Sequence, residues 1–121
     1  MRGRLADLEI ESVEDLVIAR ISGEIDSSNA AELRIALVDA LSNRIRGVVL
    51  DLGEVTYLDS TAIALIFDLA RDLEARRQAL RVAIPGGGPA RRVLELSRVD
   101  AVAPLDEDPD SAIDALAAGR A

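Results

Sequence analysis

Hydrophobic and polar residues follow two periods along this chain, one typical of strands and the other of helices. Short runs rich in Val, Ile and Leu predict strands over residues 5–11, 15–22, 46–52, 80–84 and 99–103. Apolar residues at helical spacing predict a long helix over 62–77. Three other helices are predicted to begin after Ser27-Ser28-Asn29, at Ala90, and after Pro109-Asp110-Ser111. The predicted order of elements is therefore ββαβαβαβα.

This order predicts a single α/β domain over residues 1–121, with its core at about 5–118. The sheet should be mixed and mostly parallel, with four to five strands, about four helices, and an antiparallel edge formed by the first hairpin. In such sheets, sites form where loops converge at the carboxyl ends of strands. The predicted loops 23–29 and 53–61 should share that edge, which would bring Asp26 close to Ser60.

The most informative segment runs from the apolar stretch 48–52 to Asp59-Ser60-Thr61. Asp51 is predicted to end the strand, and the Asp-Ser-Thr triplet opens the helix predicted over 62–77. A serine at a helix N-terminus can carry a phosphate that the helix dipole stabilises. The same residues also make an ordinary helix cap. Ser60 therefore has a regulatory and a structural interpretation. So does Asp26, which can cap the next helix with Ser27 or Ser28.

The residues that the chain lacks exclude most enzyme classes. It has no Cys, His or Lys, and its 14 basic residues are all Arg. This inventory excludes Ser-His-Asp triads, thiolate nucleophiles, zinc sites built on His or Cys, and P-loop or Schiff-base lysines. We expect no enzyme, no cofactor and no metal centre, although carboxylates remain that can bind Mg²⁺. Gly86-Gly87-Gly88 is accordingly predicted to be a flexible loop.

The net charge of −8 argues against a nucleic acid partner, because phosphate backbones attract basic surfaces. It favours solubility and steering toward a basic partner. No apolar run approaches the ~20 residues of a membrane-spanning helix, and no signal-peptide core follows the basic first residues. We expect a cytoplasmic protein without direct membrane insertion. The oligomeric state is not predicted.

Three segments occur in an order and at a spacing that resemble the STAS domain family: Ser22-Gly23-Glu24-Ile25-Asp26, the run 48–52, and Tyr57-Leu58-Asp59-Ser60-Thr61. STAS domains form the fold of bacterial anti-sigma factor antagonists, and the resemblance covers about residues 5–118. In stand-alone antagonists, the Ser after the Asp is phosphorylated by a partner anti-sigma factor that is also a serine/threonine kinase. The unphosphorylated antagonist binds that partner and releases the sigma factor, which regulates transcription.

The resemblance implies a role for each matching residue. Ser60 matches the phosphorylated Ser, Asp59 the preceding Asp, Thr61 the second hydroxyl, and Asp26 the Asp of the neighbouring loop. The family commonly has Gly after the hydroxyl pair, where this chain has Ala62, so the approach of a kinase at this position stays open. The implied partner-binding residues are Asp26, Asp59, Ser60, Thr61 and Ala62.

Two other functions accompany the same resemblance. STAS domains also serve as docking subunits of membrane complexes that transport lipids or anions, and as scaffold subunits of stress-signalling assemblies. The docking function does not require phosphorylation of Ser60, and a scaffold subunit would form large particles.

Overall fold

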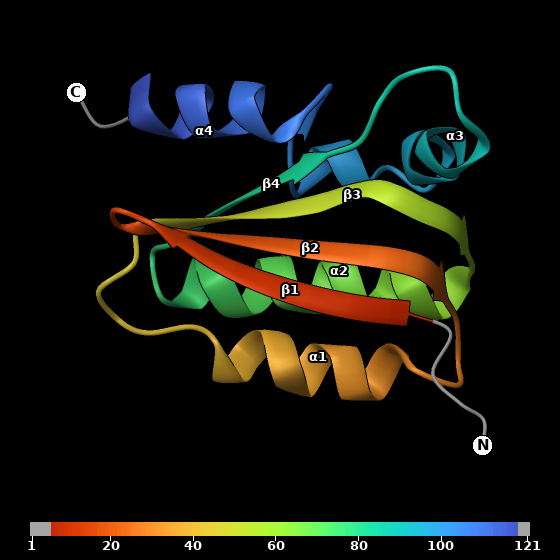
Figure 1. The fold of residues 1–121 in the computed structure, drawn as a ribbon, viewed down its shortest axis with the longest axis horizontal. Coiled ribbons are helices and arrows are strands. Elements are labelled where there is room, and N and C mark those ends of the chain that lie inside the picture. Colours follow the sequence, from red (N-terminus) through yellow and green to blue (C-terminus); the bar gives the residue numbers. More distant parts are fainter. Residues whose placement is uncertain (1–5, 119–121) are drawn as a thin grey trace.

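A computed structural model describes residues 6–118, which form the predicted order of strands and helices (Figure 1). Leu5, in the first predicted strand, lies outside the described residues. One 3₁₀ turn, η1, adds to the prediction. The elements are β1 (Ala6–Val13), β2 (Leu16–Ile25), α1 (Ala30–Asp39), β3 (Gly47–Leu58), α2 (Ser60–Ala75), β4 (Ala79–Ala83), α3 (Pro89–Leu96), η1 (Val99–Ala101), β5 (Leu105–Asp106) and α4 (Pro109–Ala118).

The five strands form one sheet in the order β1-β2-β3-β4-β5. β1 is antiparallel to β2, and the other neighbouring pairs are parallel. This arrangement confirms the predicted mixed, mostly parallel sheet with an antiparallel hairpin at its edge. Helices α1 and α2 cover one face, and α3 and α4 lie on the other (Figure 1).

Both faces of the central strands are buried, which explains their nearly continuous apolar sequence. Successive side chains of a strand point to opposite faces. Val48 and Leu50 of β3 accordingly join the larger core with α1 and α2, whereas Val49 packs with α4 on the opposite face. The helices contribute Leu33, Leu37, Leu65, Leu69 and Leu73 to the larger core, and Ala112 and Leu116 to the smaller one.

β3 is longer than its apolar run predicts. The segment 53–58, expected to lie in a loop, continues the strand because β2 stays paired with it as far as the Ile25–Leu58 pair. Asp51 therefore lies inside β3 and does not end it. It is buried because Arg20, its neighbour on β2, donates a 2.9 Å hydrogen bond from Nε to its carboxylate.

The prediction of a strand over residues 99–103 is wrong. Arg98 adopts a left-handed conformation with φ 63°, and the chain then turns as η1. The N–H groups of Val102 and Ala103 both donate to the carbonyl of Val99, which closes the turn. Val99 and Ala103 are thus buried by a turn and not by a strand, and the last strand is β5.

Candidate functional site

Asp59, and not Ser60 or Thr61, caps helix α2. Its Oδ1 atom accepts hydrogen bonds from the backbone N–H of Thr61 at 2.9 Å, from the Thr61 hydroxyl at 2.5 Å, and from the Ala62 N–H at 3.4 Å. The bond from the Thr61 hydroxyl is the main reason that the pKa of Asp59 lies below its ordinary value. The cap is therefore a carboxylate at neutral pH.

Ser60 is the first residue of α2 and is exposed. Since Asp59 caps the helix, the Ser60 hydroxyl has no hydrogen-bond partner among residues 6–118. The structural interpretation of this serine as the cap is therefore wrong.

The other two predicted residues of this segment have different environments. Thr61 is half-buried and holds Asp59 in place. Ala62 has an exposed fraction of 0 % and belongs to the core, so its methyl group presents no surface to a partner. The approach to Ser60 is set by its exposed neighbours and not by that methyl group.

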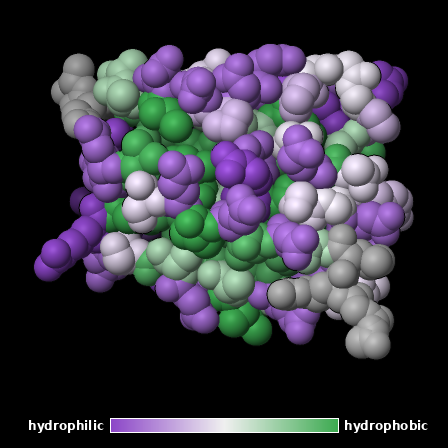
Figure 2. All heavy atoms as spheres, viewed as in Figure 1, coloured by the Kyte–Doolittle hydropathy of each residue, from purple (hydrophilic) through white to green (hydrophobic). Residues whose placement is uncertain are grey.

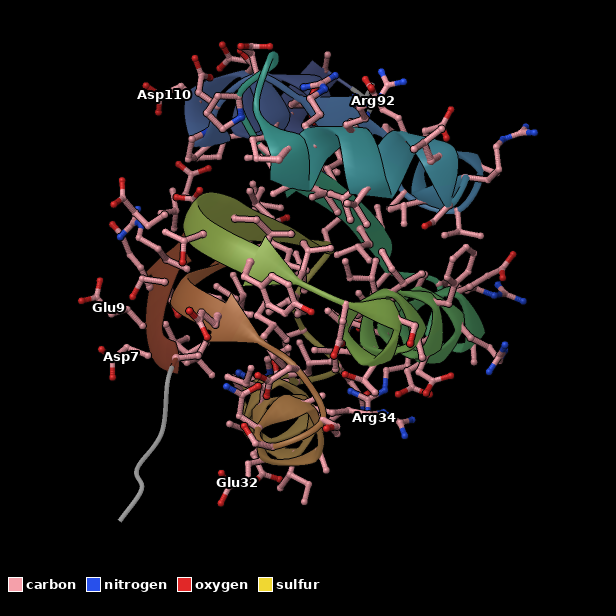
Figure 3. All side chains as sticks on the ribbon, turned by 90° about the vertical axis from the view of Figure 1, so that its right-hand side faces the viewer. Asp7, Glu9, Glu32, Arg34, Arg92 and Asp110 are labelled. Carbon is pink, nitrogen blue, oxygen red and sulfur yellow. The ribbon has the colours of Figure 1, made fainter. Side chains whose placement is uncertain are left out.

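Strand register brings Asp26 to the same end of the sheet as Asp59. Ile25 pairs with Leu58 at the ends of β2 and β3, so the residues that follow them leave neighbouring parallel strands together. Such strands lie about 4.8 Å apart. Figure 3 looks onto this end, where the arrowheads of β2 and β3 lie side by side and α2 begins. We call this end of the sheet, with Asp26, Asp59 and Ser60, the rim.

Asn29 holds the Asp26 loop in place, which the sequence did not reveal. Its side chain is 1 % exposed and does not cap α1. Instead, its Oδ1 accepts from the N–H of Asp26 at 3.1 Å, and its Nδ2 donates to the carbonyl of Glu24 at 2.8 Å. The Asp26 carboxylate accepts from the N–H and hydroxyl of Ser28, so it closes a turn and does not act as a helix cap.

Tyr57 is a second residue that sequence reasoning did not assign to the site. It is 50 % exposed, three residues before Ser60, and pairs with Glu24 of β2. Exposed tyrosines are enriched at protein interfaces, because they combine a large apolar area with a polar tip. The signal for it was present in the strand alternation, which leaves Leu58 buried and the preceding residue exposed.

The rim carries carboxylates without neighbouring cations. Among the described residues, no Arg lies within 4 Å of the carboxylate of Asp26 or Asp59. Figure 3 shows Arg34 away from the strand ends, between α1 and α2, where it pairs with Asp72 at 3.0 Å. Among residues 6–118, the two carboxylates of the rim thus have no arginine partner that could offset a further negative charge at Ser60.

Residues 6–118 contain no group of three or more His, Cys, Asp or Glu side chains arranged to hold a metal ion. None of their helices is long and apolar enough to cross a membrane.

A family model described as the STAS domain matches residues 7–112. The chain belongs to this family. A curated relative, the putative anti-sigma factor antagonist BtrV of Bordetella bronchiseptica, is 30% identical over 66 residues, which are 54% of this chain and 57% of that protein. The chain therefore matches little more than half the length of this relative.

Solved structures of STAS proteins share the fold over nearly the whole chain. An anti-sigma factor antagonist from Mycobacterium paratuberculosis has a TM-score of 0.82 at 24% identity, covering 92% of this chain and 93% of that one. The anti-sigma factor antagonist SpoIIAA in its unphosphorylated form has a TM-score of 0.77 at 21% identity, covering 93% and 97%. SpoIIAA in its phosphorylated form has a TM-score of 0.66 at 21% identity, covering 91% and 99%. These identities show a common fold.

Proposed function

We propose that this STAS domain is an anti-sigma factor antagonist whose binding to an anti-sigma factor kinase is switched off by phosphorylation of Ser60. The observation that carries the proposal is the division of roles at the start of α2. Asp59 caps the helix, which leaves the Ser60 hydroxyl exposed and unbonded among the described residues. The names of BtrV and SpoIIAA as antagonists, and the phosphorylated form of SpoIIAA, support the same interpretation.

A phosphate at Ser60 is compatible with the fold. It adds about 1.5 to 2 negative charges and three acceptor oxygens. At the first position of α2 it would face the positive end of the helix dipole, which favours an anion by roughly 0.3–1 kcal/mol. The domain should therefore keep its structure when it is phosphorylated.

The same phosphate would oppose a partner packed over the rim. It would lie beside Asp59 and close to the Asp26 loop, and neither of these carboxylates has an Arg partner among the described residues. Burying such a charge unpaired costs several kcal/mol, enough to dissociate a micromolar complex. We infer a partner surface that covers Asp26, Asp59, Ser60 and Thr61 and extends to Tyr57. This binding role needs no catalysis by the chain itself, and it places the protein in the cytoplasm with its partner.

The test is a phosphorylation assay with the candidate anti-sigma factor kinase encoded nearest to this chain. The purified proteins are incubated with ATP, and phosphosites are mapped by mass spectrometry. Phosphate on Ser60 that is absent from Ser60→Ala and present in Ser27→Ala, an exposed serine at the same rim, supports the proposal. Phosphate on Thr61 alone contradicts it. An active kinase that leaves Ser60 unmodified also contradicts it, and favours a docking or scaffold subunit.

A further inference from the structure

The two edges of the sheet differ in how they are protected. The outer edge of β1 alternates exposed acidic residues, Asp7, Glu9 and Glu11, which discourage pairing with another strand. Figure 2 shows the face that carries β1, where hydrophobic surface is broken into patches by hydrophilic side chains. At the other edge, β5 has only two residues, and it covers only part of β4.

In the part of β4 that β5 does not cover, one backbone N–H lacks a hydrogen-bond partner among residues 6–118. The N–H groups of Val82 and Ile84 donate to Pro104 and Asp106, so even-numbered residues of β4 present their N–H toward β5. Leu80 is the previous residue in this series, but the pairing with β5 begins only at Val82. Among the described residues, nothing on that side pairs with Leu80.

A groove of about 590 Å³ lies along this open edge. One wall is α2, which contributes Phe67 and Ala70, and the other is the segment after η1, which contributes Val102 and Pro104. Val102 is 43 % exposed. The groove therefore combines an open strand edge with apolar walls, the features that recognise an extended peptide.

The basic side chains that line the groove favour some extended peptides over others. Arg71 and Arg77 line it, although the chain as a whole carries a net charge of −8. Arg77 has no carboxylate within 4 Å among residues 6–118, and Arg71 pairs only with Asp68, on its own helix, at 3.2 Å. One acidic residue, Glu74, lines the groove between them. The two guanidinium groups favour an occupant that carries carboxylates.

We propose that this groove, the β4 groove, binds an extended acidic segment of a partner protein, which adds a strand beside Leu80. The surface is separate from the rim. Ala70 and Arg77 are 10 and 17 residues beyond Ser60 along the chain. At 1.5 Å per helical residue, Ala70 lies about 15 Å from Ser60, which exceeds the screening length of about 8–10 Å in physiological salt. Binding at the β4 groove should therefore be independent of charge at Ser60.

The test uses a fluorescein-labelled six-residue peptide of alternating valine and glutamate, titrated with the whole protein and followed by fluorescence anisotropy. Two comparison peptides replace glutamate by lysine, or carry N-methyl groups on alternate amides. We expect both comparison peptides to bind at least tenfold more weakly. In ¹⁵N-labelled protein, the valine–glutamate peptide should shift the Leu80 amide more than the amides of β1.

Variants connect the binding to this groove. Arg77→Glu should weaken binding of the valine–glutamate peptide about tenfold, whereas Arg76→Glu, an exposed neighbour that does not line the groove, should leave it unchanged. Circular dichroism checks that both variants are folded. Equal binding of all three peptides, or no shift at Leu80 with millimolar peptide, overturns the proposal. Ser60→Asp should not change peptide binding, so this result is separable from the phosphorylation assay.

Discussion

Asn29 provides the sharpest test of how the rim is built. Asn29→Ala removes the bond that its Oδ1 accepts from Asp26 and the bond that its Nδ2 donates to Glu24. Asn29 is buried and both hydrogen bonds are partly buried, so each backbone group loses its partner with only partial access to water. Each unsatisfied group costs about 1–3 kcal/mol, so with partial rehydration we expect a loss of about 2–3 kcal/mol in the free energy of unfolding.

The assay is urea unfolding followed by far-ultraviolet circular dichroism, with Ser27→Ala as the matched control in the same loop. The control side chain is exposed and should change stability by less than about 0.5 kcal/mol. For a domain of this size, the loss in Asn29→Ala corresponds to a Tm lower by about 8–12 °C. A loss below about 1 kcal/mol would refute the inference that this amide holds the Asp26 loop in place.

Three further predictions concern stability. Gln78→Ala removes two bonds from a buried Nε2 to backbone carbonyls, and urea unfolding should show a loss of about 1–3 kcal/mol; an unchanged midpoint would mean that water replaces the amide. Arg77→Gly should stabilise the domain by about 0.5–1 kcal/mol, because φ is 60° at Arg77 and glycine adopts positive φ without strain. Arg76→Gly, at φ −96°, should not stabilise the domain, and equal effects of the two substitutions would exclude relief of strain as the cause. Because the pKa of Asp59 is depressed in the folded state, its contribution is present above pH 3.8, its ordinary pKa, and is lost as pH falls through the folded pKa. Tm measured from pH 7 to pH 2.5 should therefore fall less steeply in Asp59→Asn, and identical slopes would contradict this origin.

Apolar periodicity was enough to predict the elements from β1 to α3 and helix α4, because these strands and helices bury a repeating set of side chains, but it did not predict the two-residue strand β5. The length of β3 was not predictable in this way. Its last residues, including Glu54 and Tyr57, are polar or exposed, and backbone pairing with β2 keeps them in the strand. This pairing joins residues about thirty positions apart in the sequence, so a local hydrophobic pattern cannot predict where the strand ends.

The cap of α2 could not be assigned from sequence for a related reason. Each residue of Asp59-Ser60-Thr61 can cap a helix, and the one that does so is decided by where β3 ends. Asp51 shows the same limit, because the arginine that stabilises its burial comes from another strand. The sequence therefore predicted that Asp26 and Ser60 follow neighbouring strand ends, and the structure shows which side chain caps α2.

The direction of the helices affects the electrostatic potential at the rim. α1 and α2 both begin at the end of the sheet where β2 and β3 finish (Figure 1). Each helix places a partial positive charge of roughly half an elementary charge at that end. Carboxylates placed there are stabilised by the backbone itself. The architecture thus favours carboxylates at the rim. The net charge of the rim's side chains alone is therefore a poor guide to the charge of its partner.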